Sequence, residues 1–503
     1  MRNIPCRTTF AGKHMAMNET SEGQRALRIA IIGAGMSGIL AAIKLREAGH
    51  PNVTIFEKAD RLGGTWRDNR YPGLACDVPS HHYAYSFELN PDWTHLFSPG
   101  PEILAYFERV AAKYGVLSQI RFGHEVRTAA YQAGQWHLSC GESPEVFDVV
   151  IAATGVLHHP VLPDIPGRDS FSGPAFHTAR WDAEVDLVDK RVGIIGTGST
   201  AIQIVPAIQP EVREVALFQR SAQWILPLPN PPYSDEDREL FRHSPQRMRE
   251  TYEFWGKRFQ NTFARAVVGD EEQLQRIAEF CESNLARVTD PELRARLTPD
   301  YRVACKRLIM SDTFYDALQQ PNARLITDGI AGIEATGVRT RDGLLHPLDV
   351  LVFATGFDGH AFMRPMSIQG EQGLSLEAAW AEGNRAYRSV ALPGFPNFFM
   401  LVGPNSPIGN FSLILIAEMQ MAYVLQLIDR LRTGECRALA PTEEATRRFN
   451  DALEEAMAKT VWVSGCRSWY IDKHGKPAMW PWSFERFERE MRRPEPADFS
   501  LVG

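Results

Sequence analysis

Two glycine-rich turns carry residue patterns that can hold the pyrophosphate of a dinucleotide. The first is Gly33-x-Gly35-x-x-Gly38, and Glu57 follows at the end of the next apolar run. The first glycine permits a tight turn, the second lets a pyrophosphate approach the backbone, and the third lets a helix pack closely on a strand. The acid is placed to accept hydrogen bonds from a ribose diol. This turn therefore predicts an unphosphorylated ribose, as in FAD.

The second turn repeats the design but ends differently. After its second apolar run comes Gln219-Arg220-Ser221 in place of an acid. An acid would repel a 2′-phosphate, whereas Arg220 can pair with it and Ser221 can donate to it. This turn therefore predicts NADPH, with a solvated surface charge as the alternative for Arg220. The loop residues that we expect at the cofactor are Gly196, Thr197, Gly198, Ser199, Thr200 and Ala201.

The elements around these turns predict an α/β fold with two Rossmann-like domains, the second inserted in the first. The segments 147–155 and 348–356 are both apolar strands with an aspartate near the start and Ala-Thr-Gly at the end. Such small residues let the chain leave a sheet close to a bound dinucleotide. We expect an FAD-binding domain at 28–156 and 359–503 and an NADPH-binding domain at 157–358.

Residues 228–300 differ in texture from the rest of the second domain. They are charged, amphipathic and without strand signals, which predicts a helical insertion that covers the cleft. Its aromatic residues are expected in the core of the insertion rather than at a substrate: Tyr252, Phe254, Trp255 and Phe259.

Composition excludes several classes of partner. The formal charge is −7 and no long basic run occurs, which argues against nucleic acid or a membrane surface. The apolar stretch 411–428 is interrupted by Glu418 and Gln420, which favours a buried helix over a membrane span. Residues 1–27 lack the apolar core of a signal peptide and are expected to be a disordered extension, or to reflect a start upstream of Met15 or Met17. The cytoplasm is the expected compartment.

The seven cysteines are scattered and form no CxxC motif. This predicts a reducing compartment, with neither a disulfide framework nor a metal site. A flavin-dependent disulfide reductase needs a closely spaced redox pair, and the closest pair in sequence, Cys281 and Cys305, does not qualify. A monooxygenase needs no redox side chain, because the flavin itself carries the oxygen.

Between the two turns lies Phe171-x-Gly173-x-x-x-His177-x-x-x-Trp181-Asp182. In residues and in position this stretch resembles the fingerprint of the type I Baeyer–Villiger monooxygenases, class B members of the flavin-containing monooxygenase superfamily. Their N- and S-oxygenating relatives usually carry a tyrosine where this chain has Trp-Asp. We interpret the stretch as a hinge between domains, and plain linker packing is the alternative.

The resemblance implies further site residues. Segment 63–87 is similar to the family's flavin-covering segment, and "CKRLI" (305–309) is similar to the one that supplies an active-site arginine, here Arg307. Lys306 would join Arg220 at the 2′-phosphate, and Asp77 would lie near the reactive face of the flavin. The other residues expected at the flavin are Gly64, Thr65, Trp66, Tyr83 and Val126.

The resemblance also implies a reaction. NADPH reduces the flavin, which traps O₂ as a C4a-peroxide; this attacks a ketone, and the adduct rearranges to an ester or lactone. A fixed cation such as Arg307 would lower the pKa of the peroxide and stabilise the oxyanion, with Asp77 holding it in place. A structural salt bridge is the alternative role for this pair. An N- or S-oxygenating monooxygenase and a non-enzymatic dinucleotide sensor are the alternative functions.

The C-terminal part departs from the cyclohexanone-type members of the family. Segment 401–414 keeps a Gly-Pro turn but continues with Asn405 and Asn410. Segment 465–487 replaces the one that brings a tryptophan toward the nicotinamide, so that Trp462, Trp469 or neither takes this place. The identity of the ketone and the oligomeric state are left open.

Overall fold

The computed structural model describes residues 25–409, 411–466, 468–476 and 478–502. Most of the predicted N-terminal extension and Asn410 therefore lie outside the described residues. Residues 25–27 pack on the body, because Leu27 is buried and the backbone N–H of Arg25 donates to the carbonyl of Arg432 at 2.9 Å. These three residues, which the sequence assigned to the extension, thus contact the first domain.

Short runs, most of them apolar, build the first sheet, in which all strands are parallel. Apolar runs suit strands that are covered on both faces. Every residue of the two strands Ile29–Ile32 and Val149–Ala152 is buried. The strand order is β19 (Phe398–Met400), β7 (Val149–Ala152), β1 (Ile29–Ile32), β2 (Val53–Phe56) and β3 (Ile120–Arg121).

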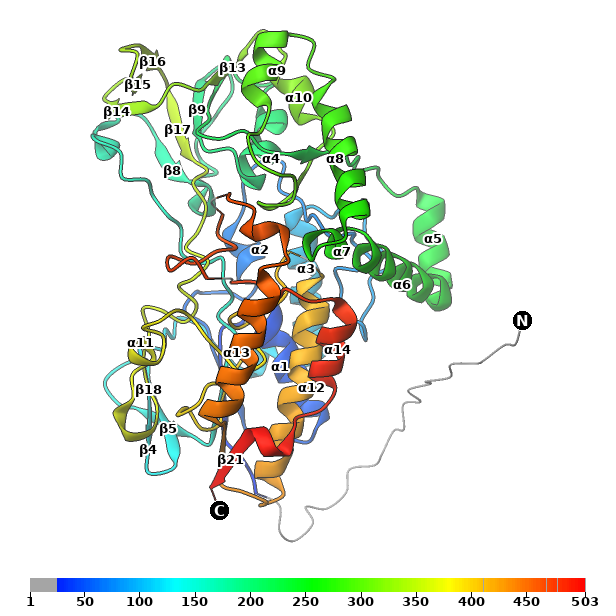
Figure 1. The fold of residues 1–503 in the computed structure, drawn as a ribbon, viewed down its shortest axis with the longest axis vertical. Coiled ribbons are helices and arrows are strands. Elements are labelled where there is room, and N and C mark those ends of the chain that lie inside the picture. The colour runs from blue at the N-terminus through cyan, green and yellow to red at the C-terminus, as the bar shows by residue number, and fades with distance from the viewer. Residues whose placement is uncertain (1–24, 410, 467, 477, 503) are drawn as a thin grey trace.

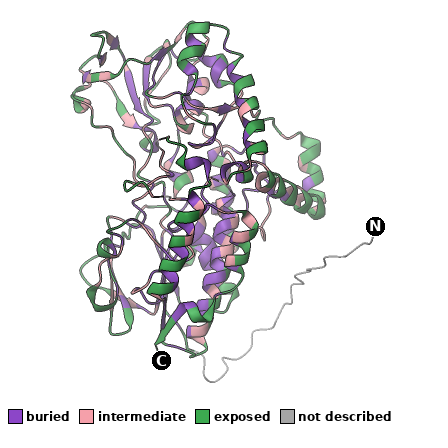
Figure 2. Ribbon diagram, viewed as in Figure 1, coloured by how far each residue is buried: buried purple, intermediate pink, exposed green. Residues whose placement is uncertain are grey.

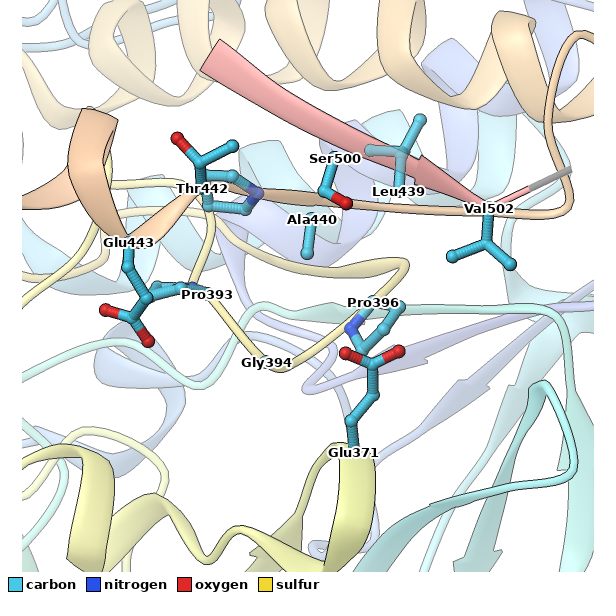
Figure 3. Close-up of a pocket in the computed structure, with 11 residues that line it drawn as sticks. Glu371, Pro393, Gly394, Pro396, Leu439, Ala440, Thr442, Glu443, Ser500 and Val502 are labelled. Atoms are coloured by element: carbon cyan, nitrogen blue, oxygen red, sulfur yellow. The ribbon is translucent and has the colours of Figure 1, made fainter.

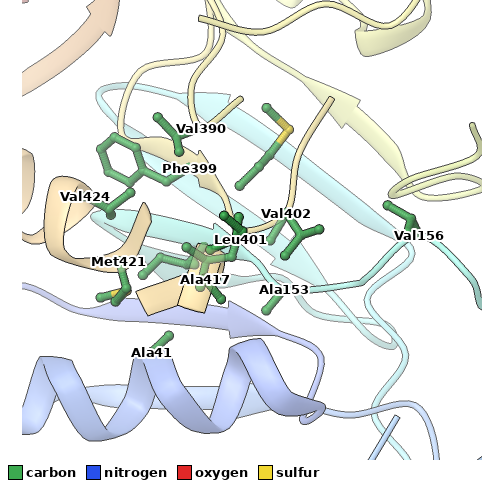
Figure 4. Packing of buried hydrophobic residues seen from close by; sticks show 14 of the residues in the cluster. Ala41, Ala153, Val156, Val390, Phe399, Leu401, Val402, Ala417, Met421 and Val424 are labelled. Atoms are coloured by element: carbon green, nitrogen blue, oxygen red, sulfur yellow. The ribbon is translucent and has the colours of Figure 1, made fainter. Parts of the chain in front are cut away.

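Two helices complete the core of this domain, α1 (Met36–Glu47) and α12 (Leu413–Arg432). Ala41 of α1 and Ala417 and Met421 of α12 meet Leu401 in the packed interior (Figure 4). The predicted buried helix is therefore confirmed as α12, which lies beside α14 (Phe484–Arg492). Among the described residues, no helix is long and apolar enough to cross a membrane.

The second sheet is also parallel throughout. Its strands fall between β7 and β19 in the chain, although β7 and β19 are neighbours in the first sheet, so the second nucleotide fold is inserted in the first as predicted. Figure 1 shows the two sheets in the upper and lower halves of the molecule. The strand order is β13 (Ala323–Ile326), β10 (Glu214–Phe218), β9 (Arg191–Ile195), β17 (Val350–Phe353) and β8 (Ala175–His177), with α4 (Ser199–Ile208) and α10 (Phe314–Leu318) packed together beside it.

Asp148 and Asp349, the aspartates near the start of the two strands that end in Ala-Thr-Gly, make the same kind of hydrogen bond in the two sheets. Asp148 accepts a hydrogen bond from the backbone N–H of Arg28 at 2.8 Å, and Asp349 accepts one from the backbone N–H of Arg191 at 2.8 Å. Each carboxylate thereby fixes the start of one central strand against the next. The repeat is structural and lies at the end of the sheet away from the glycine turns.

In the predicted insertion the stretch 235–261 projects to one side of the body (Figure 1), and the whole insertion is built mainly of helices. They are α5 (Asp235–His243), α6 (Pro245–Asn261), α7 (Phe263–Val267), α8 (Glu271–Leu285) and α9 (Pro291–Leu297). Tyr252 is buried against the ring of His82, with ring centroids 4.9 Å apart, as a core residue should be. Phe254 is 56% exposed, so the expectation of a core position is wrong for it. Much of α5 and α6 is exposed (Figure 2).

The remaining elements frame these layers. The smaller sheets consist of β18 (Ser367–Gln369), β4 (Thr128–Gln132), β5 (Gln135–Ser139) and β6 (Glu145–Phe147); of β14 (Ile330–Glu334), β15 (Gly337–Thr340) and β16 (Leu345–Pro347); of β11 (Ile225–Leu226) and β12 (Ile309–Met310); and of β20 (Ala438–Pro441) and β21 (Phe499–Val502). The remaining α-helices are α2 (Thr65–Asp68), α3 (Gly100–Lys113), α11 (Leu376–Ala379) and α13 (Glu443–Met457).

A disulfide joins Cys305 to Cys466, with the Cα atoms 6.2 Å apart and a sequence separation of 161. The expectation of a chain without disulfides is therefore wrong for this pair. No local spacing could reveal it, because the two cysteines meet only when the C-terminal segment folds back on the inserted domain.

Candidate active site

The first glycine of each turn packs against the Ala-Thr-Gly end of a neighbouring strand. Gly33 has φ +104°, and a Cβ on it would stand 2.6 Å from the carbonyl oxygen of Ala153. Gly196 has φ +114°, and a Cβ on it would stand 2.4 Å from the carbonyl oxygen of Ala354. Only glycine fits such a position. The same packing of a turn glycine against the end of a neighbouring strand therefore occurs in both nucleotide folds.

Of the other residues in the two turns, some pack closely against the protein and others face open space. A Cβ on Gly38 would stand 1.9 Å from the carbonyl oxygen of Gly33, so this glycine lets α1 approach β1, and Ala201 is buried at the matching position of α4. A Cβ on Gly35 would have no neighbour closer than 3.7 Å, and one on Gly198 would have none within 4 Å. Both turns therefore leave room in front of a helix N-terminus, where backbone N–H groups suit phosphate.

A cavity of about 550 Å³ opens at the carboxyl end of the first sheet. Glu57 lines it and is held by the backbone N–H groups of Ala34 and Ala59, each at 2.9 Å, and by Arg67 at 3.0 Å. This donor set fits FAD, with a glycine turn for the pyrophosphate, an acid for the ribose and aromatic rings farther along. The predicted residues that line the cavity are Gly33, Gly35, Glu57, Gly64, Thr65, Trp66, Tyr83 and Val126.

Two histidines at the same cavity were not predicted from the sequence. His158 donates a ring N–H to the carbonyl of Phe362 at 2.8 Å, and His159 donates one to the carbonyl of Arg364 at 2.6 Å. Burial lowers the pKa of His158 to about 4, so it is neutral near pH 7. Their place directly after the first Ala-Thr-Gly strand end was the signal that could have pointed to them.

Asp77 and Arg307 form an ion pair, as the resemblance implied. Their side chains are 29% and 31% exposed, and Asp77 raises the pKa of Arg307, which secures its positive charge. Neither residue lines the large cavity, but Tyr83 does. Burial raises the pKa of Tyr83, Asp77 adds to this shift and Arg307 opposes it, so the pair acts electrostatically on the cavity wall.

Two cations gather at the end of β10. Arg220 is exposed, and Lys306 is half-buried with its Nζ 4.1 Å from the centre of the Tyr301 ring. Burial lowers the pKa of Lys306 and Arg220 lowers it further, whereas Asp300 opposes the shift. Like charges held together in this way suit a dianionic ligand, so the site fits the 2′-phosphate of NADPH.

The rest of the second turn is tied to this strand end. The hydroxyl of Thr197 donates to the carbonyl of Ser221 at 2.8 Å, which joins the glycine loop to the segment that carries Arg220. The helix α4 begins with Ser199 and Thr200, beside the open space at Gly198.

The fingerprint is not a free linker, because it contains β8, an edge strand of the second sheet. His177 is buried; its Nδ1 accepts from the backbone N–H of Ala179 at 3.0 Å, and its Nε2–H donates to the carbonyl of Gly356 at 3.1 Å. A Cβ on Gly173 would stand 2.5 Å from the carbonyl oxygen of Asp349. The fingerprint thus braces the strand that ends in the second Ala-Thr-Gly.

The other fingerprint side chains are less buried. Phe171 packs beneath the second sheet, and the ring of Trp181 lies 5.0 Å from that of Phe176 in an edge-to-face contact. The carboxylate of Asp182 accepts from the backbone N–H of Glu184 at 3.0 Å. These contacts are local to the inserted domain.

Of the two C-terminal tryptophans, Trp462 is 1% exposed, which leaves no face for a ligand. Trp469 is half-buried, and its ring would lie 3.3 Å from a Cβ on Gly359. Leu157, which lines the large cavity, lies beside the same glycine. Trp469 is therefore the candidate that the geometry leaves.

A second cavity, of about 290 Å³, lies between β20, β21 and the loops at 371 and 393–396 (Figure 3). Its polar side chains include Glu371 and Glu443, and its remaining wall is largely proline and small aliphatic residues. None of the site residues predicted from the sequence lines it.

Comparison with known proteins agrees with this geometry. The family model for flavin-binding monooxygenase-like proteins matches residues 26–230. An uncharacterized monooxygenase of Mycobacterium tuberculosis is 46% identical over 474 residues, which cover 94% of this chain and 96% of that protein. A Baeyer–Villiger monooxygenase of Streptomyces coelicolor is 40% identical over 496 residues, which cover 97% of this chain and 95% of that protein.

The fold has matches among solved structures. The crystal structure of OTEMO in complex with FAD and NADP superposes with a TM-score of 0.86 at 27% identity, covering 95% of this chain and 100% of that one. Two Rossmann-type domains, a cavity that fits FAD and full-length relatives in one enzyme class lead to one conclusion. The chain belongs to the Baeyer–Villiger monooxygenases and is an FAD- and NADPH-dependent flavoenzyme.

Proposed function

We propose that this chain oxidises a ketone to an ester or lactone with O₂ and NADPH, and that Arg307 is the cation of the oxygenation step. The observation that carries this proposal is the Asp77–Arg307 pair beside Tyr83. It supports a fixed positive charge next to a cavity that fits FAD, in a region where a carbonyl oxygen can be stabilised as it gains negative charge.

FAD, when bound, accepts a hydride from NADPH and passes activated oxygen to the substrate. The chain's own residues bind and orient the two cofactors and polarise the carbonyl group of the substrate. Glu57 and the first glycine turn hold the adenosine end of FAD, and Arg220 with Lys306 holds the 2′-phosphate of NADPH. Arg307 stays protonated whatever its surroundings, so it presents a constant charge to the carbonyl oxygen. Asp77 limits the orientations of its guanidinium.

The domain boundaries 28–156, 157–358 and 359–503 and the hinge role of the fingerprint are part of the same proposal. The sheet memberships support the division. His177 and Gly356 both lie in the inserted domain, and Gly356 lies two residues before its proposed end at 358, so this position next to the connection is what supports the hinge role. The cytoplasm stays the expected compartment.

Oxygenation of an amine or a sulfide is the alternative, and it shares every cofactor feature. The test is to incubate the purified yellow protein with NADPH and air. The substrates are a panel of linear, cyclic, aromatic and steroidal ketones with matched amines and sulfides, and the products are read by mass spectrometry. Esters from at least one class of ketone support the proposal. Sulfoxides or N-oxides without any ester would overturn it, and a sensor would not bleach its flavin rapidly with NADPH.

A further inference from the structure

The C-terminal segment brings a tyrosine to the side of Arg307. Tyr470 is 1% exposed, and its ring packs on Trp462 and Trp469 at centroid distances of 5.3 and 4.8 Å. Its hydroxyl oxygen and Nη1 of Arg307 lie 2.9 and 3.1 Å from the point where a Cβ on Gly409 would stand. The two groups therefore meet over a glycine that places no side chain between them.

The hydroxyl of Tyr470 has no hydrogen-bond partner among the described residues. A buried hydroxyl that stays unpaired is unfavourable, and the guanidinium of Arg307 is the charged donor next to it. Burial raises the pKa of Tyr470 and Arg307 opposes that shift, so the phenol stays neutral and its oxygen can accept. A small movement of either side chain completes the hydrogen bond.

The disulfide ties the same segment to the loop that carries Arg307. Cys466 lies four residues before Tyr470, and Cys305 lies two residues before Arg307. Both the main chain of the segment and its tyrosine are thus held near the guanidinium. Asp77 accepts a hydrogen bond from Nη2 of Arg307, a different nitrogen from the one that lies near Gly409 together with the Tyr470 hydroxyl.

We propose that Tyr470 is a positioning residue for the oxygenation reaction. Its hydroxyl oxygen accepts a hydrogen bond from Nη1 of Arg307 while Asp77 holds Nη2, and the Cys305–Cys466 disulfide keeps the tyrosine within reach. A planar guanidinium that is held at two nitrogens cannot rotate away from its productive orientation. The inference rests on the proposed role of Arg307.

The test variant is Tyr470→Phe, which keeps the ring packing and removes one oxygen atom. The ester formed per NADPH consumed is expected to fall about tenfold, with hydrogen peroxide in its place, because a hydrogen bond to a charged group is lost. The rate of flavin bleaching by NADPH is expected to stay at the wild-type value. An ester yield at the wild-type level would overturn the proposal.

Tyr423→Phe is the matched control. Tyr423 is fully buried, its hydroxyl has no hydrogen-bond partner among the described residues, and it lies beside Arg388, whose guanidinium carbon is 5.8 Å from the ring centre. This variant removes the same atom from a similar setting outside the proposed site. Its ester yield is expected to equal that of the wild type. An equal loss in both variants would show a general effect of removing buried hydroxyls and would overturn the proposal.

Two further measurements separate positioning from packing. In an Arg307→Lys background, Tyr470→Phe should change the ester yield less than about twofold, since the fork that it orients is gone. A full tenfold loss there would show that Tyr470 acts elsewhere. In a crystal structure of the Tyr470→Phe holoenzyme, the guanidinium should be displaced from its wild-type orientation, and an unmoved guanidinium would contradict the proposal.

The disulfide is tested with Cys305→Ser combined with Cys466→Ser. The yield is expected to fall between those of the wild type and Tyr470→Phe, and a wild-type yield would remove the disulfide from the account. Arg307→Ala keeps the two proposals apart. If it retains the wild-type yield, the proposed function of Arg307 fails. If it loses the ester while Tyr470→Phe does not, only the inference on Tyr470 fails.

Discussion

At the scale of single residues, the two nucleotide sites differ in the side chains that lie shortly after β2 and β10. Glu57 accepts two backbone hydrogen bonds and pairs with Arg67, so its carboxylate is held in place at the cavity. At the matching point of the second site stands Arg220, with Lys306 close enough for Arg220 to lower its pKa. We propose that an acid at one site and two cations at the other are the physical basis of cofactor choice.

Arg220→Ala should raise the KM for NADPH at least about tenfold and leave the KM for NADH nearly unchanged, because only NADPH carries the extra phosphate. Steady-state kinetics with both cofactors measure this difference. Arg213→Ala is the control, since Arg213 is 64% exposed and lies just before the same strand, β10. Equal losses with NADPH and NADH would contradict the assignment.

Gly35→Val should abolish FAD incorporation while the chain still folds. A Cβ at this position would meet only the backbone of Gly64, at 3.7 Å, so the side chain would project into the space in front of α1. Gly38→Val should instead prevent folding, because its Cβ would overlap the carbonyl of Gly33. Flavin absorbance per protein and the melting temperature distinguish the two variants. A fully yellow Gly35→Val protein would show that this loop does not hold FAD.

At the scale of elements, local patterns predicted the features that depend on neighbours in sequence. The strand, turn and helix of each nucleotide site, the helices of the insertion and the buried helix α12 can all be inferred from apolar spacing over short windows. The contacts that escaped prediction join distant residues. The fingerprint becomes an edge strand only by pairing with β17, and Cys305 meets Cys466 only across the fold.

The predicted core position of Phe254 on the insertion was also wrong, and this error too comes from contacts between residues that are distant in sequence. Helical spacing around Tyr252 predicts an apolar face but not how far the body covers it. Tyr252 packs on His82 of the first domain, whereas the ring of Phe254 packs on its neighbour Trp255, at a centroid distance of 5.1 Å, and stays 56% exposed. How much of α6 the body covers depends on how the insertion packs on the first domain, and this packing cannot be predicted from the local sequence pattern.

The docking of α6 should weaken as the pH falls from about 6.5 to about 4. The ring of His82 packs against Tyr252 and Gly256 of α6, and burial lowers the pKa of His82 to about 4. An unfolded histidine binds a proton below about pH 6.5, so the unfolded state gains protons first and the free energy of unfolding falls in this window, by at most about 1.4 kcal/mol per pH unit.

His82→Gln removes the titration at one position, and thermal unfolding at pH 7 and pH 5 measures the effect. The melting temperature of the variant should fall less over this interval than that of the wild type. Burial also lowers the pKa of His81 to about 4, so His81 titrates in the same pH window. Because His81 is present in both the wild type and the variant, its contribution is the same in both. An identical fall in both proteins would contradict a buried neutral His82.

At the scale of the whole molecule, the proposed oxygenation site is assembled from separate parts of the chain. Asp77 comes from the first nucleotide domain, Arg307 from the inserted domain just before β12, and Tyr470 from the C-terminal segment. Hydride transfer needs the two cofactors aligned, whereas the proposed role of Arg307 makes oxygenation depend on this charge as well. The two halves of the reaction should therefore be separable by one substitution.

The ester formed per NADPH consumed by Arg307→Ala, read alongside stopped-flow spectra of the flavin, tests the role of this cation most directly. The variant should fold, bind FAD and consume NADPH, but release hydrogen peroxide and lose roughly 10²–10³ of the oxygenation rate, since one stabiliser of developing negative charge is gone. Arg307→Lys should recover only part of the yield, because an ammonium lacks the planar fork. If Arg307→Ala makes ester at the wild-type yield per NADPH, Arg307 is a structural partner of Asp77 and its proposed role in oxygenation is wrong.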